Sequence, residues 1–544
     1  MTQRTRPIHD VAAELGLDPA AVTTLGHSKA KLDPYCVPPM GDAGGALVLV
    51  SAITPTRYGE GKTTVSIGLA DGLRRVGARA ALALREPSLG PVFGMKGGGT
   101  GGGRAQLTPA DDINLHFTGD LHAIAAAHNL LAAMIDTELH FGARDGGARS
   151  GIDPERVTWS RALDMNDRAL RRVVLDAGGR AERSSRFDIT AASEVMATLA
   201  LATSLDDLRT RLGRTVVGWR NDGTPVRVDD IEATEAMLAL LRDAVQPNLV
   251  QSLDGTPAVV HCGPFANIAH GCSSVLATRL ALRHADVVVT EAGFGFDLGG
   301  EKFLHIKAPQ AGVWPRCVVL VATVRALAHH GGGDLAAGLA HLDRQVANVR
   351  AFGLPPVVAI NVFADDQDDD LAAIERRASD LGAAAARCHA FAEGGGGGVA
   401  LAAAVREVLR GNADDPPAPQ ALYDADADVA DKLRSVVQRV YGGADVAFSD
   451  AAAQQLQQLR SAGYGTLPVC VAKTHLSFSD DPKGGGLVSG FTPTVSEVRL
   501  AAGAGFVVAL MGTIFTMPGL PRDPAARHVR VDANGRVRGL MQGG

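Results

Sequence analysis

The sequence has few aromatic side chains, no cysteine pair and no long apolar run. Phe, Trp and Tyr make up 4% of the 544 residues, and no apolar stretch approaches the ~18 residues that a membrane-spanning helix needs. The six cysteines stand singly, without Cys-x-x-Cys or any other zinc-site spacing, and the N-terminus lacks the apolar segment of a signal peptide. We therefore expect a cytoplasmic protein with reduced thiols and no membrane partner.

The sequence also lacks a large excess of either positive or negative residues. Lys+Arg 53 against Asp+Glu 59 gives a net charge of −6, which does not favour a nucleic acid as a partner. Glycine, in contrast, is abundant: 64 residues, about 12% where ~7% is usual. Much of it lies at 97–103 and 394–398, and we expect these runs to present backbone to ligands. A flexible linker is the alternative for 97–103.

Short apolar runs, each followed by a polar or glycine-rich loop and often by a helical pattern, recur along the first two thirds of the chain. They cover 46–53, 78–84, 257–262, 285–291, 317–323 and 356–361. This alternation is typical of parallel β/α units, so the predicted fold class is α/β. In such sheets ligands bind beyond the carboxyl ends of the strands, and the loops there are the best places to look for function.

The chain is predicted to form a large P-loop-type parallel-sheet domain and two smaller α/β domains. Their boundaries are 1–345, 346–428 and 429–544. A helix is expected at 334–353, and the Pro/Asp-rich stretch 412–429 is interpreted as a linker. The third domain has strands of its own, expected at 467–472 and 505–512.

The segment TPTRYGEGKTT at 54–64 lies between the first strand and a helical pattern. Its Gly-Lys-Thr ending is that of a P-loop, where backbone N–H groups surround phosphates, the lysine reaches the β- and γ-phosphates and the hydroxyl binds Mg²⁺. Thr56 replaces the first glycine of the pattern, and an ordinary turn with a surface lysine is the alternative. We predict ATP as ligand, Lys62 as a catalytic cation and Thr63 as the Mg²⁺ ligand. The predicted ATP-binding residues are Thr54, Pro55, Gly59, Glu60, Gly61, Lys62, Thr63 and Thr64.

Arg85 and Glu86 follow the second strand and would face the same crevice as the P-loop. Arginine suits bidentate contact with carboxylate or phosphoryl oxygens, whereas a structural ion pair is the alternative. His270, in a later loop, is interpreted as a hydrogen-bonding or capping group, with a catalytic role as the alternative.

Together the segments ITPT, GEGKTT, REPSLGP, DINLHFTGD, FANIAHGC, TEAGFGFDLG and TMPGLP resemble the formate–tetrahydrofolate ligase family. The resemblance runs from about residue 25 to the C-terminus. It implies an enzyme of one-carbon metabolism that uses ATP to ligate formate to N10 of tetrahydrofolate through formyl phosphate. It also implies a homotetramer and a monovalent cation, K⁺ or NH₄⁺.

The resemblance assigns roles to individual residues. Arg85 would hold formate and formyl phosphate, Glu86 would organise that loop, and Asp120 would face the folate amine or the metal, so all three join Lys62 as catalytic candidates. The aromatic residues Phe363 and Phe391 would stack on the pterin, with Phe391 standing where the family has Trp.

Other departures from the family pattern lie beside these positions. They are Arg57, Tyr58, Arg104, Glu393, Gly396, Leu476 and Ser496. One alternative is therefore a diverged P-loop ligase acting on another carboxylate or pterin. A second is a regulatory switch ATPase, but such a protein would not need REPSLGP or the paired aromatic residues.

Overall fold

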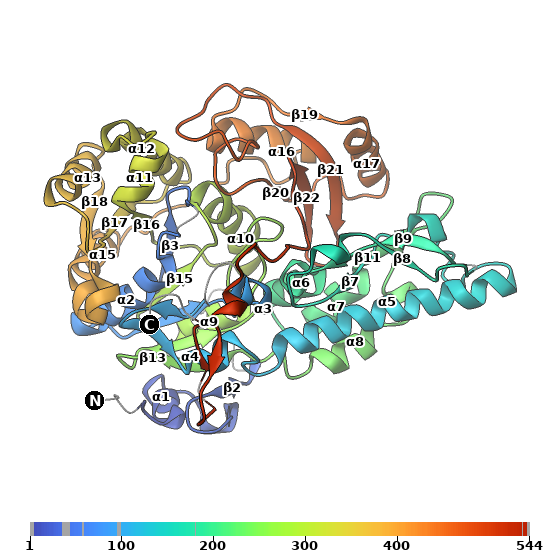
Figure 1. Ribbon diagram of the computed structural model, residues 1–544, viewed down its shortest axis with the longest axis horizontal. Helices are drawn as coiled ribbons and strands as arrows, with labels where there is room; N and C mark the ends of the chain where they lie inside the picture. Colours follow the sequence, from blue (N-terminus) through green and yellow to red (C-terminus); the bar gives the residue numbers. More distant parts are fainter. Residues whose placement is uncertain are drawn as a thin grey trace.

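The computed structural model describes residues 5–34, 44–56, 59–94, 99–179, 181–535 and 537–540. Its centre is a large, mostly parallel sheet with helices on both faces (Figure 1). The parallel strands, in spatial order, are β14 (Pro257–Val260), β4 (Ala80–Leu84), β15 (Val287–Glu291), β3 (Ala46–Ala52), β16 (Cys317–Ala322), β17 (Pro356–Asn361) and β18 (Ala384–Cys388). This architecture confirms the predicted α/β class.

All six predicted apolar runs form strands of this sheet, with small differences at their ends. β14 stops two residues before the predicted end, and Cys262 then takes a left-handed conformation with φ of 56°. The edge strand β18 was not predicted, because its sequence AAARC has no β-branched or aromatic residue. An antiparallel extension beside β14 comprises β13 (Asn248–Ser252), β2 (Ala30–Leu32), β1 (Val22–Thr24), β6 (Ala105–Thr108) and β5 (Gly101–Gly102).

The parallel strands other than the edge strand β18 are buried at every position, which explains why they are mostly apolar. In β3, Leu47 and Leu49 face one core and Val48 and Val50 face the other. Helices α2 (Lys62–Arg75) and α15 (Val399–Gly411) contribute to the second core. Helices α9 (Val275–His284), α12 (Leu335–Ala351) and α13 (Asp368–Asp380) contribute to the first. The helix predicted at 334–353 is α12.

A helical lobe extends from one side of the sheet. Its longest element is α5 (Asp120–Asp145), which packs with α6 (Glu194–Leu201), α7 (Leu205–Arg214) and α8 (Thr234–Leu241) around a separate apolar core. Figure 1 shows the far end of α5 at the edge of the molecule, beside β8 (Val173–Leu175) and β9 (Arg183–Ser185). The first residue of α5 lies near the sheet, so this lobe reaches the candidate site.

The C-terminal part forms its own smaller sheet, with strands in the order β19 (Ala447–Phe448), β21 (Thr494–Ala501), β22 (Phe506–Met511) and β20 (Val469–Ala472). It is flanked by α16 (Val429–Val436) and α17 (Asp450–Ser461). The strands predicted at 467–472 and 505–512 are therefore confirmed. Because β17 and β18 belong to the large sheet, residues from the predicted middle domain extend the sheet of the first. The domain boundaries at 345 and 428 stay predictions.

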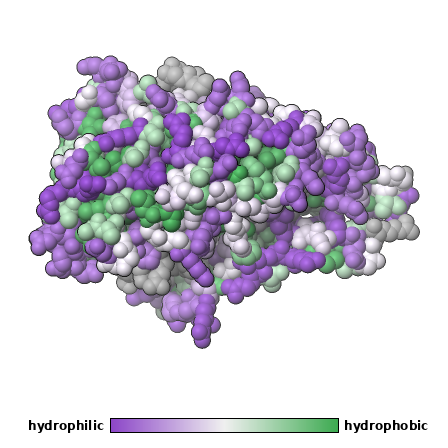
Figure 2. Space-filling view, turned by 90° about the horizontal axis from the view of Figure 1, so that it is seen from above, coloured by the Kyte–Doolittle hydropathy of each residue, from purple (hydrophilic) through white to green (hydrophobic). Residues whose placement is uncertain are grey.

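The face of the molecule in Figure 2 is mostly hydrophilic, with hydrophobic side chains in small areas between the polar ones. Within the described residues, none of the helices combines the length and apolar character that a membrane crossing requires.

The glycine run at 394–398 forms a 3₁₀ helix that packs directly on α2. A Cβ atom on Gly398 would collide with the carbonyl oxygen of Gly68, and one on Gly72 would lie 2.6 Å from the carbonyl oxygen of Gly398. The expectation that this run presents backbone to ligands is therefore wrong for Gly398, which allows two helices to approach closely. In the other run, Gly97 and Gly98 lie outside the described residues.

Candidate active site

The carboxyl ends of β3, β4, β15, β16 and β17 lie along one edge of the sheet, and the segments that follow them form the candidate site. After β3 the chain turns through glycines with positive φ, 76° at Gly59 and 73° at Gly61, and α2 begins at Lys62. A side chain on Gly61 would collide with the Asn361 amide. A helix that begins after such a turn directs backbone N–H groups toward its N-terminal end, a geometry that suits anions, so this loop fits a nucleotide phosphate.

The predicted ATP-binding residues divide into two groups by burial. Gly59, Gly61, Lys62 and Thr63 are half-buried and remain partly accessible at the start of α2. Thr54, Pro55, Glu60 and Thr64 are buried. The first group remains accessible to a ligand, whereas the side chains of the second group face the protein interior.

The buried Glu60 stabilises the loop through hydrogen bonds. One carboxylate oxygen accepts hydrogen bonds from the backbone N–H and hydroxyl of Thr56, at 2.8 and 2.9 Å, and the other accepts from the Thr323 hydroxyl at 2.7 Å. The Asn361 amide donates to the Glu60 carbonyl at 3.1 Å. Thr56 therefore replaces the first P-loop glycine and uses its hydroxyl to hold the loop.

The Glu291 carboxylate lies between the P-loop and Arg85. One oxygen accepts from the Thr63 hydroxyl at 2.9 Å, and the other lies 3.6 Å from a guanidinium nitrogen of Arg85. The guanidinium also donates to the Pro264 carbonyl at 3.4 Å and keeps a quarter of its side chain exposed. Arg85 thus has an acidic partner, but the partner is Glu291 and not its neighbour Glu86.

Glu86 and Asp120 lie buried near each other on the other side of Arg85. Asp120 accepts from the Lys31 ammonium at 2.6 Å and from the Asn248 amide at 2.8 Å. Burial, reinforced by the charges of Asp120 and Asp164, raises the pKa of Glu86 well above its ordinary value. Its Oε2 atom has no hydrogen-bond partner among the described residues. Glu86 is therefore a buried carboxyl that favours its protonated form.

His270 is fully buried, and burial together with nearby cations, Lys307 foremost, lowers its pKa well below the ordinary value. Neither ring nitrogen has a hydrogen-bond partner in the part of the chain that the structure describes. The expectation that it caps or hydrogen-bonds is therefore wrong.

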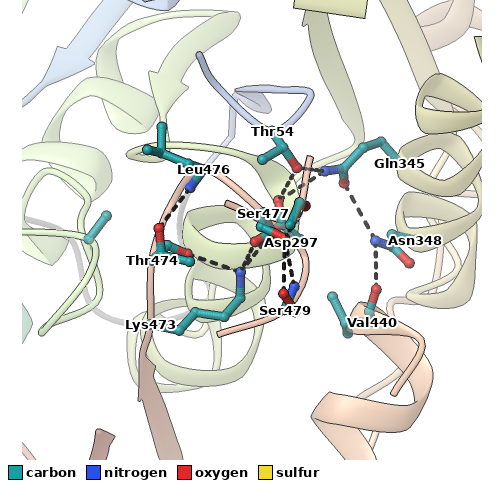
Figure 3. Close-up of polar contacts among 12 residues, drawn as sticks. Thr54, Asp297, Gln345, Asn348, Val440, Lys473, Thr474, Leu476, Ser477 and Ser479 are labelled. Atoms are coloured by element: carbon teal, nitrogen blue, oxygen red, sulfur yellow. Dashed lines mark hydrogen bonds and ion pairs between the residues drawn. The ribbon is translucent and has the colours of Figure 1, made fainter. Parts of the chain in front are cut away.

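A buried polar network ties the C-terminal part of the chain to the P-loop (Figure 3). The Lys473 ammonium forms an ion pair with Asp297 at 3.3 Å and donates to the Ser477 carbonyl at 2.5 Å. The second Asp297 oxygen accepts from the Thr54 hydroxyl at 3.3 Å and from the Gln345 amide at 2.9 Å. The Thr54 side chain therefore serves this network.

The predicted folate residues follow the adjacent strands β17 and β18. The Arg325 guanidinium lies 3.6 Å from the centroid of the Phe363 ring. Phe391, in α14 (Ala390–Glu393), is 46% exposed and packs near the 101–103 turn, and its carbonyl accepts from the Arg104 backbone at 2.8 Å. Both rings therefore lie at the edge that carries the P-loop, and the pterin slot itself stays a prediction.

Sequence comparison identifies the family. A sequence model described as "Formate--tetrahydrofolate ligase" matches residues 1–541. The chain belongs to the formate–tetrahydrofolate ligase family. A relative of that name from Myxococcus xanthus is 54% identical over 99% of both chains, and one from Acidiphilium cryptum is 53% identical over 99% of this chain and 98% of its own. The same name belongs to a relative from Symbiobacterium thermophilum that is 50% identical.

A formate–tetrahydrofolate ligase of this ATP-dependent family needs sites for ATP and Mg²⁺, and the residues present fit both. The start of α2 offers backbone donors, and Thr63 offers a hydroxyl beside the Glu291 carboxylate. Across the described ranges, no cluster of three or more His, Cys, Asp or Glu side chains could hold a metal ion. The pairing of one hydroxyl with one carboxylate at Thr63 and Glu291 suits Mg²⁺, which usually takes one or two carboxylates and completes its shell with phosphates and water.

The sequence interpretation missed three residues of this site, Glu291, Asp297 and Lys473. Glu291 had a detectable signal, because it is an acidic residue at the end of a predicted apolar strand. The other two are recognisable only from contacts between distant segments.

Proposed function

We propose that the chain catalyses the ATP-dependent ligation of formate to tetrahydrofolate, giving 10-formyltetrahydrofolate, ADP and phosphate. The observation that carries the proposal is the Glu291 carboxylate, which reaches both the P-loop hydroxyl and the Arg85 guanidinium. The proposed phosphate site at Thr63 and the proposed formate site at Arg85 would therefore lie one side chain apart. Transfer of a phosphoryl group to formate requires the two substrates to be this close.

The first step is phosphoryl transfer. A formate oxygen attacks the γ-phosphorus, the bond from that phosphorus to the bridging oxygen of ADP breaks, and formyl phosphate forms. Lys62 and the backbone N–H groups from Gly59 to Lys62 would hold the phosphates, and Thr63 would hold Mg²⁺. When bound, Mg²⁺ would neutralise phosphate charge. Glu60 and Thr54 would act indirectly, by keeping the loop in place.

The second step is transfer of the formyl group. N10 of tetrahydrofolate attacks the carbonyl carbon, the carbon–oxygen bond to phosphate breaks, and the proton that N10 loses passes to the departing phosphate. Arg85 would hold formate and then formyl phosphate. Glu86, kept protonated by burial and by Asp120, would donate a hydrogen bond near the reacting oxygens. Asp120 would act through Glu86, since its own oxygens bind Lys31 and Asn248.

Tetrahydrofolate would bind through its pterin. We propose that Phe363 and Phe391 stack on it, which would place the amine at the edge of the sheet that carries Arg85. Replacement of the family's Trp by Phe391 keeps the stacking surface and loses an indole N–H donor.

Three further properties belong to the proposal through the family resemblance. They are a homotetramer, a monovalent cation such as K⁺ or NH₄⁺, and a cytoplasmic location. Sedimentation of the purified protein would test the tetramer, and assays with each cation in turn would test the cation.

The deciding experiment supplies purified protein with ATP, formate and tetrahydrofolate, omitting each in turn. Acid converts 10-formyltetrahydrofolate to its strongly absorbing methenyl form, which should appear only when all three are present. ADP release that does not depend on formate would contradict the ligase function, and preference for acetate over formate would favour a different carboxylate. Regulatory ATPase activity is not favoured, because a switch needs neither Arg85 nor the aromatic pair.

A further inference from the structure

Glu291 reaches both halves of the site with a single carboxylate. It is the last residue of β15, and β15 lies between β3, which leads into the P-loop, and β4, which leads to Arg85. Within the sheet, Glu291 is level with Val50 of β3, and Thr290 is level with Ala83 of β4. The order of the strands thus directs one oxygen toward Thr63 and the other toward Arg85.

The Glu291 carboxylate is buried and contacts both halves of the site. Its side chain is 5% exposed, and one oxygen lies 3.6 Å from a guanidinium nitrogen of Arg85. The other oxygen accepts a hydrogen bond from the Thr63 hydroxyl at 2.9 Å. Thr63 is the residue whose hydroxyl the P-loop pattern assigns to Mg²⁺.

A bound triphosphate would bring several negative charges close to this carboxylate. Two like charges a few ångströms apart in a poorly hydrated site repel strongly. A divalent cation between them reverses the sign of the interaction. We therefore expect the site to bind nucleotide more tightly with Mg²⁺ than without it.

We propose that Glu291 is the protein carboxylate that takes part, with Thr63, in holding Mg²⁺, and that it makes nucleotide binding depend on the ion. Glu291 is a positioning residue for the transfer step, and Arg85 keeps its carboxylate aimed at the P-loop. The inference rests on the proposed function for the identity of the nucleotide and the metal. It goes beyond that function by assigning a residue that the sequence pattern did not.

The test compares nucleotide binding with and without Mg²⁺ in wild type and in Glu291→Gln. Calorimetry with adenylyl imidodiphosphate, in MgCl₂ or in EDTA, gives an affinity for each condition in the absence of formate and tetrahydrofolate. We expect Mg²⁺ to strengthen binding to wild type and the variant to lose roughly tenfold or more of that gain. Affinity in EDTA should stay equal or rise, because a repelling charge has been removed.

Two further variants complete the test. Asp286→Asn changes a carboxylate at the opposite end of the same strand, where Asp286 pairs with the exposed Arg79, and should keep the full Mg²⁺ gain. Glu291→Asp keeps the charge on a side chain that is one carbon shorter, so the increase in nucleotide affinity with Mg²⁺ should be intermediate. This variant replaces Glu291→Gln in the test if Glu291→Gln does not fold.

An unchanged Mg²⁺ gain in Glu291→Gln, or in Glu291→Asp where it serves as the substitute, would overturn the proposal. Equal losses of affinity in MgCl₂ and in EDTA would also overturn it, because they indicate a purely structural role. The titrations need no turnover. If wild type shows the gain but makes no formyltetrahydrofolate, the proposed function fails while the role of Glu291 stands.

Discussion

Lys473 forms a buried ion pair with Asp297, although 176 residues separate them in the chain. The pair joins the loop after β20, in the C-terminal sheet, to the loop after β15, and Asp297 continues to Thr54 beside the P-loop. The C-terminal sheet is thereby coupled to the nucleotide site through side chains that solvent does not reach.

Replacing Lys473 with Met should destabilise the protein strongly. Asp297 would lose its cation while remaining buried, and removing one partner of a buried pair typically costs about 3–5 kcal/mol. Thermal unfolding should show a clear fall in melting temperature. The matched control is Arg434→Met, which breaks an exposed pair with Asp445 and should cost under ~1 kcal/mol. Equal melting temperatures for the two variants would contradict the structural role of the buried pair.

Replacing Lys62 with Ala should abolish ligation and leave the fold intact. Lys62 is half-buried at the first position of α2, so its truncation leaves no large cavity. Loss of the cation should reduce kcat by at least about a hundredfold, because electrostatic stabilisation provides most of the catalysis of phosphoryl transfer. The measurement is product formation, with circular dichroism as the check of folding. Substantial retained activity would mean that this loop is not a P-loop.

Arg85→Ala should weaken formate binding more than nucleotide binding. The guanidinium offers two parallel donors to a carboxylate, and losing them should raise KM for formate by roughly tenfold or more. Arg85→Lys keeps the charge but not the fork geometry, and should give an intermediate KM. An unaltered KM for formate in both variants would remove Arg85 from the formate site.

Glu60 should influence nucleotide affinity through Thr56 and Thr323. Thr323→Val removes the hydrogen bond that the Thr323 hydroxyl donates to Glu60. If Glu60 holds the loop in place, this variant should weaken nucleotide binding by a few-fold, which corresponds to ~1 kcal/mol. Thr323→Ser keeps the hydroxyl and should bind normally. If Glu60 instead contacted ATP directly, Thr323→Val would leave nucleotide affinity unchanged.

Burial of Asp71 on α2 should contribute stability that is lost as pH rises. Burial, with help from the charge of Asp254, raises the pKa of Asp71 to about 6 from 3.8, against hydrogen bonds from Ser252 and Thr256 that lower it. The folded state thus binds this proton more tightly than the unfolded state. The stabilisation is complete below pH ~4 and is lost as pH rises to ~6, by about 2–3 kcal/mol.

Asp71→Asn should remove this pH dependence. The difference in melting temperature between the variant and wild type should therefore shift in favour of the variant between pH 4 and pH 7. Asp415→Asn, at an exposed position, serves as the control and should follow wild type throughout. Parallel curves for wild type and Asp71→Asn would mean that Asp71 titrates normally in the folded state.

The central strands were predictable because local sequence decides them. A run such as 46–53, apolar at every position except Ser51, is typical of a strand buried on both faces when a glycine-rich loop and a helix follow. The P-loop was predictable for the same reason, since Gly61, Lys62 and Thr63 are contiguous.

Contacts between distant segments were not predictable from the same residues. Thr63 and Glu291 are 228 residues apart, and they meet only because β15 lies beside β3. Strand order is a property of the whole sheet and leaves no local pattern. Burial of Glu60 was equally hidden, since an acidic residue in a loop is ordinarily exposed.

The contact between α2 and the glycine helix at 394–398 has a consequence for how the two substrates meet. α2 carries the predicted phosphate-binding residues at its start, and Phe391, a predicted folate residue, lies just before the glycine helix. Where the two helices meet, at Gly68 and Gly398, backbone lies directly against backbone, with no side chain between them. If ATP and tetrahydrofolate bind as proposed, this contact would fix the distance between formyl phosphate and the attacking amine, and a methyl group at Gly398 would change it.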